Sequence, residues 1–257
     1  MKRYKAYFFD LYGTLVDIHT DEESLHHMVN TADWYSRHGA PYAPKAVREE
    51  YLLADREDRE RVKKQWKTQN KVCKYPESDI GNVFRKLYEM KGVSPTAKLI
   101  EETAWEFRKS STTHLRLYAG AKELLAALRE QGSKVYLLSN AQALFTMPEL
   151  RLLGIADLFD DIHISSQIGA MKPDPLFYGY ALKKHSLDPA DCLMVGNDLR
   201  CDILGAANAG MDGYYIYSKL SPKDDWELLE KNRSLDTLAG FQKGMDLHLL
   251  RKRLTYA

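Results

Sequence analysis

A set of polar residues stands directly after short apolar segments or turns of this sequence. Asp10 follows the aromatic and aliphatic run at 4–9, and Gly13 supplies the backbone freedom that a sharp turn requires. The later members of the set are Ser139, Asn140, Lys172, Asn197, Asp198 and Asp202. Taken singly, each has an ordinary structural explanation as a helix cap, a turn residue or a surface lysine. In α/β proteins, however, the carboxyl ends of parallel strands meet at one crevice, where such side chains would come together.

Two carboxylates, a hydroxyl and a lysine in one crevice form a coherent chemical set. The Asp10 carboxylate can attack phosphorus or carbon and form a covalent aspartyl intermediate, which water then hydrolyses. Clustered carboxylates also suit Mg²⁺, which prefers oxygen ligands. Ser139 can hydrogen-bond the group that is transferred, and Lys172 can favour the ionised form of Asp10 and stabilise negative charge in the transition state.

The elements that would position these residues alternate between strand and helix after residue 118. The sequence predicts helices at 121–131, 149–154, 175–185 and 203–210. It predicts strands at 4–9, 135–138, 162–165, 192–195 and 214–217. This alternation favours an α/β fold, with a parallel sheet covered by helices on both faces.

The stretch from 17 to 114 differs from the rest because it is helical in character throughout. Apolar residues recur at helical spacing in two of its segments, 46–53 and 80–87. A last helix is predicted at 99–108, before the chain returns to the alternating pattern. The tail at 236–253 ends in a basic helix, which we interpret as a solvated amphipathic face, its role being open.

The composition excludes several classes of protein. With 44% hydrophobic residues in 257, the chain can bury a sizeable core, and 37 Lys and Arg nearly balance 36 Asp and Glu. No net charge therefore attracts nucleic acid or an anionic membrane. No segment approaches the roughly 20 apolar residues of a membrane span, and the first residues lead into the first strand without an apolar leader. We expect a cytoplasmic protein without nucleic-acid or membrane partners.

The three cysteines, Cys73, Cys192 and Cys201, are widely spaced and form no CxxC pair. This pattern argues against a disulfide framework and against a structural zinc site. We expect reduced thiols.

Four segments together resemble the haloacid dehalogenase-like superfamily of hydrolases, which use an aspartate nucleophile. They are 10–14 (Asp-Leu-Tyr-Gly-Thr), 139–140 (Ser-Asn), 172–175 (Lys-Pro-Asp-Pro) and 196–206, which begins Gly-Asn-Asp. The resemblance implies a Rossmann-like core at 1–16 and 115–257. It also implies a helical cap domain at 17–114, inserted after the first segment.

The resemblance assigns a role to each matching residue. Asp10 would be the nucleophile and Lys172 the charge balancer, while Thr14, Ser139 and Asn140 would support or contact the substrate. The Mg²⁺ ligands would be Asp10, the backbone carbonyl of Tyr12, Asp198, and either Asn197 or Asp202. The implied activity is Mg²⁺-dependent hydrolysis of a small phosphate monoester through an aspartyl-phosphate on Asp10.

Tyr12 departs from the pattern of the family's phosphatases, which carry a second aspartate at this position to protonate the leaving group and activate water. A tyrosine, with a pKa near ~10, is poorly matched to this work, which is typically worth ~10²–10⁴-fold in rate. Tyrosines at positions 12 and 178 resemble the pattern of the metal-independent 2-haloacid dehalogenases, whose halide leaving group needs no proton. Asp198 favours a cation and hence a phosphate substrate instead. The alternatives are a dehalogenase and a weakly active binding or regulatory protein.

A dehalogenase would also need an arginine in the cap to hold the carboxylate of its substrate. Arg37, Arg48 and Arg56 are candidates by location only. Neither the physiological substrate nor the oligomeric state is indicated by the sequence.

Overall fold

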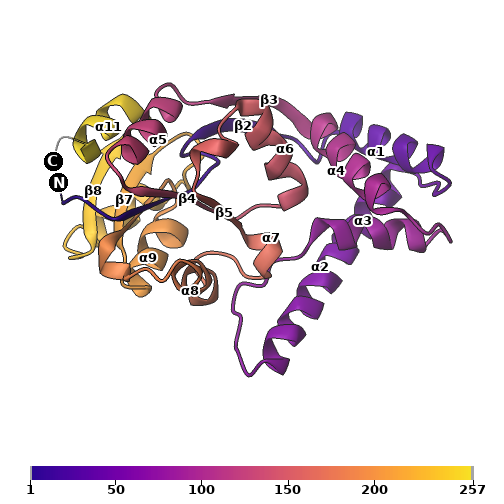
Figure 1. Ribbon diagram of the computed structural model, residues 1–257. Helices are drawn as coiled ribbons and strands as arrows, with labels where there is room; N and C mark the ends of the chain where they lie inside the picture. Colours follow the sequence, from indigo (N-terminus) through magenta and orange to yellow (C-terminus); the bar gives the residue numbers. More distant parts are fainter. Residues whose placement is uncertain (1, 256–257) are drawn as a thin grey trace.

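A parallel sheet forms the centre of one half of the molecule in the computed structural model, which describes residues 2–255 (Figure 1). Its strands lie in the order β5 (Asp161–Ile164), β4 (Lys134–Ser139), β1 (Ala6–Phe9), β6 (Cys192–Gly196), β7 (Asp212–Tyr217) and β8 (Leu238–Lys243). Within β1, Phe9 is in register with Leu137 of β4 and Val195 of β6. The predicted parallel sheet is confirmed. The first and last residues of the predicted core, 1 and 257, lie outside the described residues.

Helices cover both faces of this sheet because successive residues of each strand point to opposite sides. Tyr7 and Phe9 pack with helices on one face, and Ala6 and Phe8 pack on the other. The first face carries α5 (Ala121–Glu130), α6 (Ala143–Leu153) and α11 (Leu247–Thr255). The second face carries α8 (Pro175–Lys184) and α9 (Gly205–Asn208). Shorter elements complete this half: η1 (Ala156–Leu158), α7 (Ser165–Ile168), η2 (Pro189–Asp191), η3 (Leu199–Leu204) and α10 (Asp225–Lys231).

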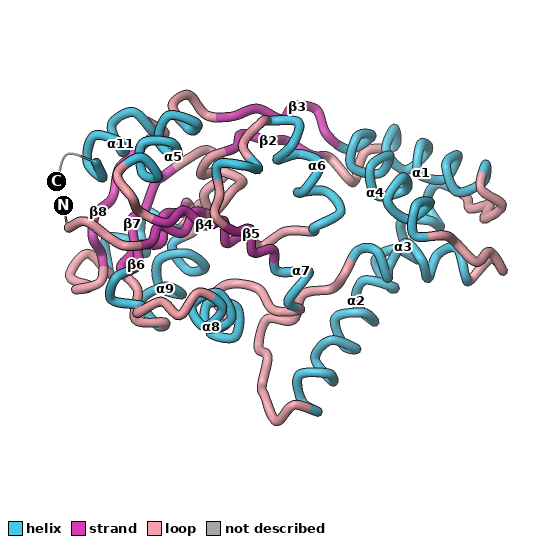
Figure 2. Tube along the Cα trace, in the orientation of Figure 1, coloured by secondary structure: helices cyan, strands magenta, loops and turns pink. Residues whose placement is uncertain are grey.

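Four helices form the other half of the molecule, beside the sheet (Figures 1 and 2). They are α1 (Leu25–Arg37), α2 (Pro44–Thr68), α3 (Ile80–Glu89) and α4 (Ala97–Ser111). Their shared apolar cluster is rich in aromatic residues, including Tyr35, Phe84 and Phe107, and it also takes in Phe145 of α6.

The two ends of the 17–114 stretch are strands, which corrects the expectation of helix throughout. β2 (Val16–Thr20) and β3 (Thr112–Leu117) pair antiparallel and connect the helical block to the sheet half. Val16 and Ile18 of β2 are buried, whereas His19 is exposed, so the strand follows a two-residue period. A five-residue strand is too short for this period to stand out beside a helical region.

A loop gives the helical block a further attachment to the sheet half. The segment between α2 and α3 lies against the segment that carries Lys172, where Met171 N–H donates to Tyr75 O at 2.9 Å. Asp174 caps α8 with one carboxylate oxygen. Its other oxygen accepts the backbone N–H groups of Lys74 and Tyr75 at 2.7 and 3.1 Å.

Other differences from the predicted elements have local causes. α6 begins at Ala143 rather than at 149, because packing of the apolar side chains Phe145 and Leu150 outweighs the interruption at Pro148. β8 was not predicted, since its sequence contains Gly240 and only pairing with β7 makes it a strand. The predicted basic helix of the tail is α11, in which Leu247, Leu250 and Leu254 are buried while Lys252 is exposed.

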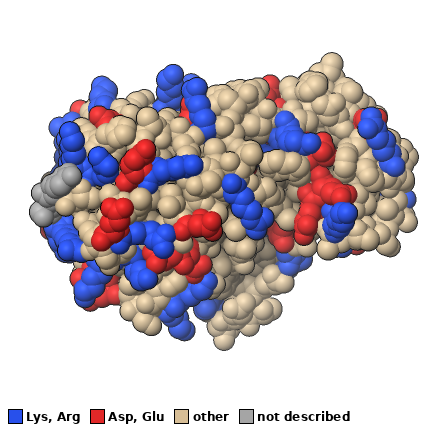
Figure 3. All heavy atoms as spheres, turned by 45° about the horizontal axis from the view of Figure 1, so that its top comes forward, with Lys and Arg blue, Asp and Glu red and all other residues tan. Residues whose placement is uncertain are grey.

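Positive and negative side chains are interspersed over the face drawn in Figure 3. Within residues 2–255, no helix has the length and apolar character needed to cross a membrane.

Candidate active site

Asp10 lies at the carboxyl end of β1, where the chain leaves the middle of the sheet. Its backbone N–H donates to Val195 O at 2.9 Å, which extends the β1 to β6 pairing by one residue and fixes the start of the turn. Gly13 continues the turn with φ +87°, a conformation that favours glycine. The hydroxyls of Thr14 and Ser139 lie 3.3 Å from Asp10 Oδ2 and 3.5 Å from Asp10 Oδ1, respectively.

Lys172 is buried and gives each of its ammonium hydrogens a partner. Nζ lies 2.8 Å from Asp10 Oδ1, 2.7 Å from Asp202 Oδ1 and 2.7 Å from Leu138 O. Burial alone would lower the pKa of Lys172, but attraction to the Asp10 and Asp202 carboxylates outweighs burial and raises it. The ammonium therefore stays charged beside Asp10 at neutral pH.

Asn140 holds Lys172 in place. Its Nδ2 donates to Lys172 O at 2.9 Å, and its Oδ1 accepts from Lys172 N at 2.7 Å. The sequence predicts a substrate contact for this residue, whereas its amide is already committed on both sides to the Lys172 backbone.

Asp202 faces Lys172 from the start of the helical turn after β6. Its Oδ1 accepts from Lys172, and its Oδ2 accepts from Asp198 N at 3.0 Å. Burial raises the pKa of Asp202 to about 7, against the opposing effect of Lys172. Gly196 makes room for this carboxylate, since a Cβ there would lie 2.1 Å from Asp202 Oδ2. With both oxygens engaged, Asp202 acts as a partner of Lys172.

Asp198 is only partly buried and keeps an oxygen available. Its Oδ1 accepts from Cys201 N at 2.7 Å and so caps the turn η3. Its Oδ2 has no hydrogen-bond partner among the described residues. Of the two aspartates in this segment, Asp198 is therefore the one with a carboxylate oxygen to offer a cation.

The neighbouring Asn197 reaches Asp10. In the orientation that satisfies both ends of its amide, the nitrogen donates to Tyr12 O at 3.1 Å and to Asp10 Oδ2 at 3.3 Å. Asn197 packs directly on Gly13, where a Cβ would come within 2.3 Å of the amide. A carboxylate oxygen and a backbone carbonyl thus converge on one positively polarised nitrogen.

These groups fit a magnesium ion by the chemistry of the donors. Mg²⁺ takes hard oxygen ligands and is usually held by one or two carboxylates. Asp10 Oδ2 and Tyr12 O already share one electropositive partner, and Asp198 contributes a carboxylate from the adjoining residue.

Tyr12 is engaged by residues that the sequence did not single out. Its hydroxyl lies 3.0 Å from Thr146 Oγ1 and donates to Glu149 Oε2. Arg108 of α4 donates to the other oxygen of Glu149 at 2.6 Å and lies over the Tyr12 ring. Burial, and then the nearby Glu149 carboxylate, raise the pKa of Tyr12 well above its ordinary value. The sequence signal for Glu149 was a lone carboxylate in a mostly apolar helix, which requires a partner when buried.

A cleft of about 460 Å³ opens beside Tyr12, between the helical block and the carboxyl ends of the strands. Its polar wall includes Asn140 and Gln142 from the sheet half and Asp55, Arg59 and Arg108 from the helices. The three arginines proposed by location, Arg37, Arg48 and Arg56, do not line it. Helical periodicity could not separate Arg59 from Arg56, which is exposed on another face of α2.

Tyr178 is buried beneath the site. Its hydroxyl donates to Cys201 O at 2.7 Å and lies 3.1 Å from Asp202 O. Asp225, which the sequence did not indicate, accepts from Leu199 N at 2.7 Å. Both residues therefore hold the turn that carries Asp198 and Asp202, and neither lines the cleft.

Comparison with known proteins agrees with this architecture. A sequence model of haloacid dehalogenase-like hydrolases matches residues 4–210. The chain is 27% identical over 225 residues to glyceraldehyde 3-phosphate phosphatase of Pyrococcus furiosus, covering 87% of this chain and 85% of that protein. It is 27% identical over 217 residues to human N-acylneuraminate-9-phosphatase, covering 82% and 81%. The solved 2-haloacid dehalogenase of Pseudomonas syringae shares the fold, with a TM-score of 0.60 and 18% identity over 99% of this chain and 100% of that one.

Proposed function

This chain belongs to the haloacid dehalogenase-like hydrolase family, and we propose that it is a phosphatase that hydrolyses a small phosphate monoester through an aspartyl-phosphate on Asp10. The observation that carries the proposal is the contact between Lys172 Nζ and Asp10 Oδ1, at 2.8 Å, at the end of the central strand. It joins a nucleophile to a fixed cation that can stabilise developing negative charge. The relatives named as phosphatases support phosphorus as the target.

In the proposed reaction an oxygen of Asp10 attacks phosphorus, and the bond from phosphorus to the alcohol oxygen of the substrate breaks. Lys172 stays protonated throughout and offsets the charge that builds on the reacting group. Ser139 and Thr14 are positioned as hydroxyl donors around the two oxygens of Asp10. Water then attacks the aspartyl-phosphate and releases inorganic phosphate and the free Asp10 carboxylate.

We propose Asp10, the carbonyl of Tyr12 and Asp198 as ligands of Mg²⁺, with Asn197 orienting the first two and Asp202 holding Lys172. When bound, Mg²⁺ would supply charge neutralisation for the phosphoryl oxygens. The donor set supports this assignment, since all three ligands are oxygens and Asp198 Oδ2 has no partner among the described residues.

No carboxylic acid stands at position 12 to protonate the leaving alcohol. The Tyr12 hydroxyl is committed to Glu149 and has a raised pKa, so it is a poor substitute at neutral pH. The proposed phosphatase therefore prefers substrates whose leaving group has a low pKa, or it turns over slowly on alkyl phosphates.

We propose that residues 17–114 act as a cap domain over a core of 1–16 and 115–257. The aromatic cluster of the four helices supports this division, because it is largely separate from the two clusters on the faces of the sheet. The cleft lies between the two parts, so side chains such as Arg59 would select the substrate.

A second candidate is a metal-independent 2-haloacid dehalogenase, which the tyrosine at position 12 favours. Asp10 would then attack carbon and displace halide, which needs no proton. Arg59 and Arg108 line the cleft, but both are paired with carboxylates, Asp55 and Glu149. A weakly active binding or regulatory protein would keep the fold and the Mg²⁺ site without turnover.

One assay separates these functions: incubation with p-nitrophenyl phosphate and with 2-chloropropionate, each with Mg²⁺ and with a chelator. Phosphate release that the chelator abolishes is the expected result. Halide release insensitive to the chelator would replace the phosphatase with the dehalogenase. Mg²⁺ binding without turnover of either substrate would indicate the regulatory protein. Asp10→Asn should be inactive in either enzyme, and full activity in this variant would overturn the nucleophile assignment.

A further inference from the structure

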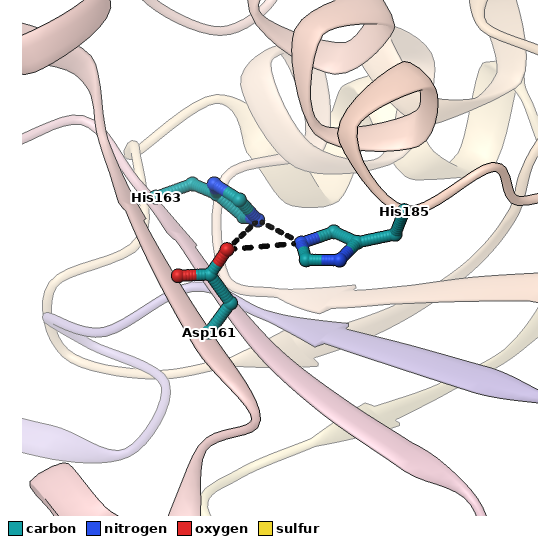
Figure 4. Close-up of side chains that lie close together, drawn as sticks. All are labelled: Asp161, His163 and His185. Atoms are coloured by element: carbon teal, nitrogen blue, oxygen red, sulfur yellow. Dashed lines mark hydrogen bonds and ion pairs between the residues drawn. The ribbon is translucent and has the colours of Figure 1, made fainter.

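Three side chains on the edge of the sheet half, none of them part of the site around Asp10, bring metal-ligating atoms together. Figure 4 shows these three side chains. Asp161 and His163 belong to the edge strand β5, and His185 stands at the end of α8. His185 Nε2 lies 3.1 Å from His163 Nε2 and 3.0 Å from Asp161 Oδ2, and the remaining side of the triangle is 3.7 Å.

This triangle has the dimensions of one face of a metal coordination sphere. Zn²⁺ is bound tetrahedrally at about 2.0–2.1 Å from histidine nitrogen and carboxylate oxygen, which places two ligands about 3.3–3.4 Å apart. The three separations here, 3.0, 3.1 and 3.7 Å, bracket that value. The donor atoms need little movement to share one ion.

Hydrogen bonds alone satisfy the two histidine nitrogens of this triangle poorly. His185 Nε2 carries one hydrogen as a donor and none as an acceptor, yet it is close to both His163 Nε2 and Asp161 Oδ2. At most one shared hydrogen can serve both contacts. A cation at the centre would engage all three lone pairs at once.

Packing holds each ligand in its present orientation. The Asp161 Oδ1 atom accepts from Ile162 N at 2.9 Å, so Oδ2 is turned toward the histidines. The His185 ring stacks on Tyr136 with centroids 4.3 Å apart. His163 has 1% of its side chain exposed, whereas Asp161 and His185 keep 26% and 18% exposed, which leaves a route for an ion and a solvent ligand.

We propose that Asp161, His163 and His185 form a binding site for a divalent transition metal of the Zn²⁺ class, with water in the fourth position. Imidazole nitrogens suit Zn²⁺, Co²⁺ or Ni²⁺ far better than Mg²⁺, so this site and the proposed oxygen-rich site at Asp10 select different ions. The bound ion would fasten the edge strand β5 to the end of α8. The cysteine pattern gave no sign of such a site, because no cysteine contributes to it.

Lys184 competes with the metal for Asp161. Its Nζ lies 2.7 Å from Asp161 Oδ2, and 44% of its side chain is exposed. An ion at the site therefore displaces Lys184 into solvent. Removing this charge should strengthen metal binding.

The test uses the full chain, stripped of metal with a chelator and returned to buffer with excess Mg²⁺ to occupy the oxygen-rich site. Titration with Co²⁺, followed by its visible absorption, should show one equivalent bound, and Zn²⁺ should displace it. His185→Phe keeps a ring on Tyr136, and Asp161→Asn keeps the bond to Ile162 N–H. Each should weaken Co²⁺ binding by about tenfold or more, since loss of even a hydrogen-bond partner of a metal ligand typically lowers metal affinity by about 10–100-fold.

Lys184→Gln should tighten Co²⁺ binding, and Asp198→Asn should leave it unchanged, which separates this site from the proposed Mg²⁺ site. Circular dichroism checks that each variant is folded. Absence of Co²⁺ uptake by the unmodified protein would overturn the proposal. Undiminished uptake in folded His185→Phe, or loss of uptake in Asp198→Asn, would do so as well.

Discussion

Asn140 and Lys172 are joined by two reciprocal hydrogen bonds, from Asn140 Nδ2 to Lys172 O at 2.9 Å and from Lys172 N to Asn140 Oδ1 at 2.7 Å. The residue that follows the β4 strand end thus fixes the backbone from which the Lys172 side chain reaches Asp10. The placement of the ammonium depends on a contact that does not touch Asp10 at all.

Asn140→Ala should lower kcat by about 10- to 100-fold with a smaller change in KM, because the loss of both bonds lets the Lys172 ammonium shift relative to Asp10. Steady-state kinetics on an aryl phosphate would measure this split. Asn140→Asp keeps the hydrogen-bond acceptor and loses the donor. Its kcat should fall between those of the unmodified protein and Asn140→Ala. A rise in KM alone would mean that Asn140 instead binds substrate.

Lys172→Met should destabilise the fold by about 3–5 kcal/mol, because it leaves the buried carboxylates of Asp10 and Asp202 without their shared cation. Urea unfolding at pH 7 would measure the free energy of unfolding. Adding Asp202→Asn to Lys172→Met removes one of the unpaired charges and should restore part of the loss. Equal stability of the single and double variants would contradict the view that Lys172 compensates the charges of both Asp10 and Asp202.

Tyr12→Phe should change kcat by less than about fivefold. The Tyr12 hydroxyl of the unmodified protein is hydrogen-bonded to Glu149, and its raised pKa makes it a poor proton donor at neutral pH. Stability should fall by about 1–3 kcal/mol, because Glu149 loses a buried donor. Kinetics and urea unfolding on the same preparation would separate the two effects. A loss of ~10²–10⁴-fold in kcat would instead make Tyr12 the acid of the reaction.

His27 on α1 should lower the stability of the protein as the pH falls from 7 to 5, an effect that buried carboxyls with a raised pKa, such as Asp202, oppose. Burial lowers the pKa of His27 to about 4, against the attraction of Asp21 and with a small contribution from His26. The unfolded chain, with a histidine pKa near ~6.5, therefore takes up a proton over this range that the folded chain does not, which costs about 1–2 kcal/mol. Thermal unfolding at both pH values, compared with a variant that does not titrate at this position, would measure the contribution of His27.

His27→Asn supplies the comparison, because its amide can replace the ring nitrogen that contacts Ser110 Oγ at 2.7 Å without titrating. As the pH falls from 7 to 5, the stability of this variant should rise relative to that of the unmodified protein. His26→Asn, at an exposed position on the same helix, should leave the pH dependence as it is. If the change in stability between pH 7 and pH 5 were the same in His27→Asn as in the unmodified protein, His27 would not contribute to the pH dependence.

The sequence predicted the elements whose patterns are local and strong. The apolar run before Asp10, the helix closed by Gly132 and the strand before Ser139 all lie within two residues of their predicted limits. β8 and the pair β2 and β3 were missed because their stability comes from partners far along the chain, which no local period records.

The same distinction applies to the site. Asp10 and Lys172 could be predicted to meet because a parallel sheet brings its strand ends together. Neither the pairing of Asn140 with the Lys172 backbone nor the chain from Tyr12 through Glu149 to Arg108 has a local signature. Arg108 is 41 residues from Glu149, and only the packing of α4 against α6 joins them.

The loop that ties the helical block to the segment around Lys172 has a mechanical consequence. The backbone bonds that Tyr75 makes, to Met171 and to the Asp174 carboxylate, flank Lys172 on both sides. Any swing of the helices away from the sheet must either break these bonds or pull on the peptide that carries the ammonium. An opening movement of the helices that admitted substrate would therefore also disturb the contact of Lys172 with Asp10.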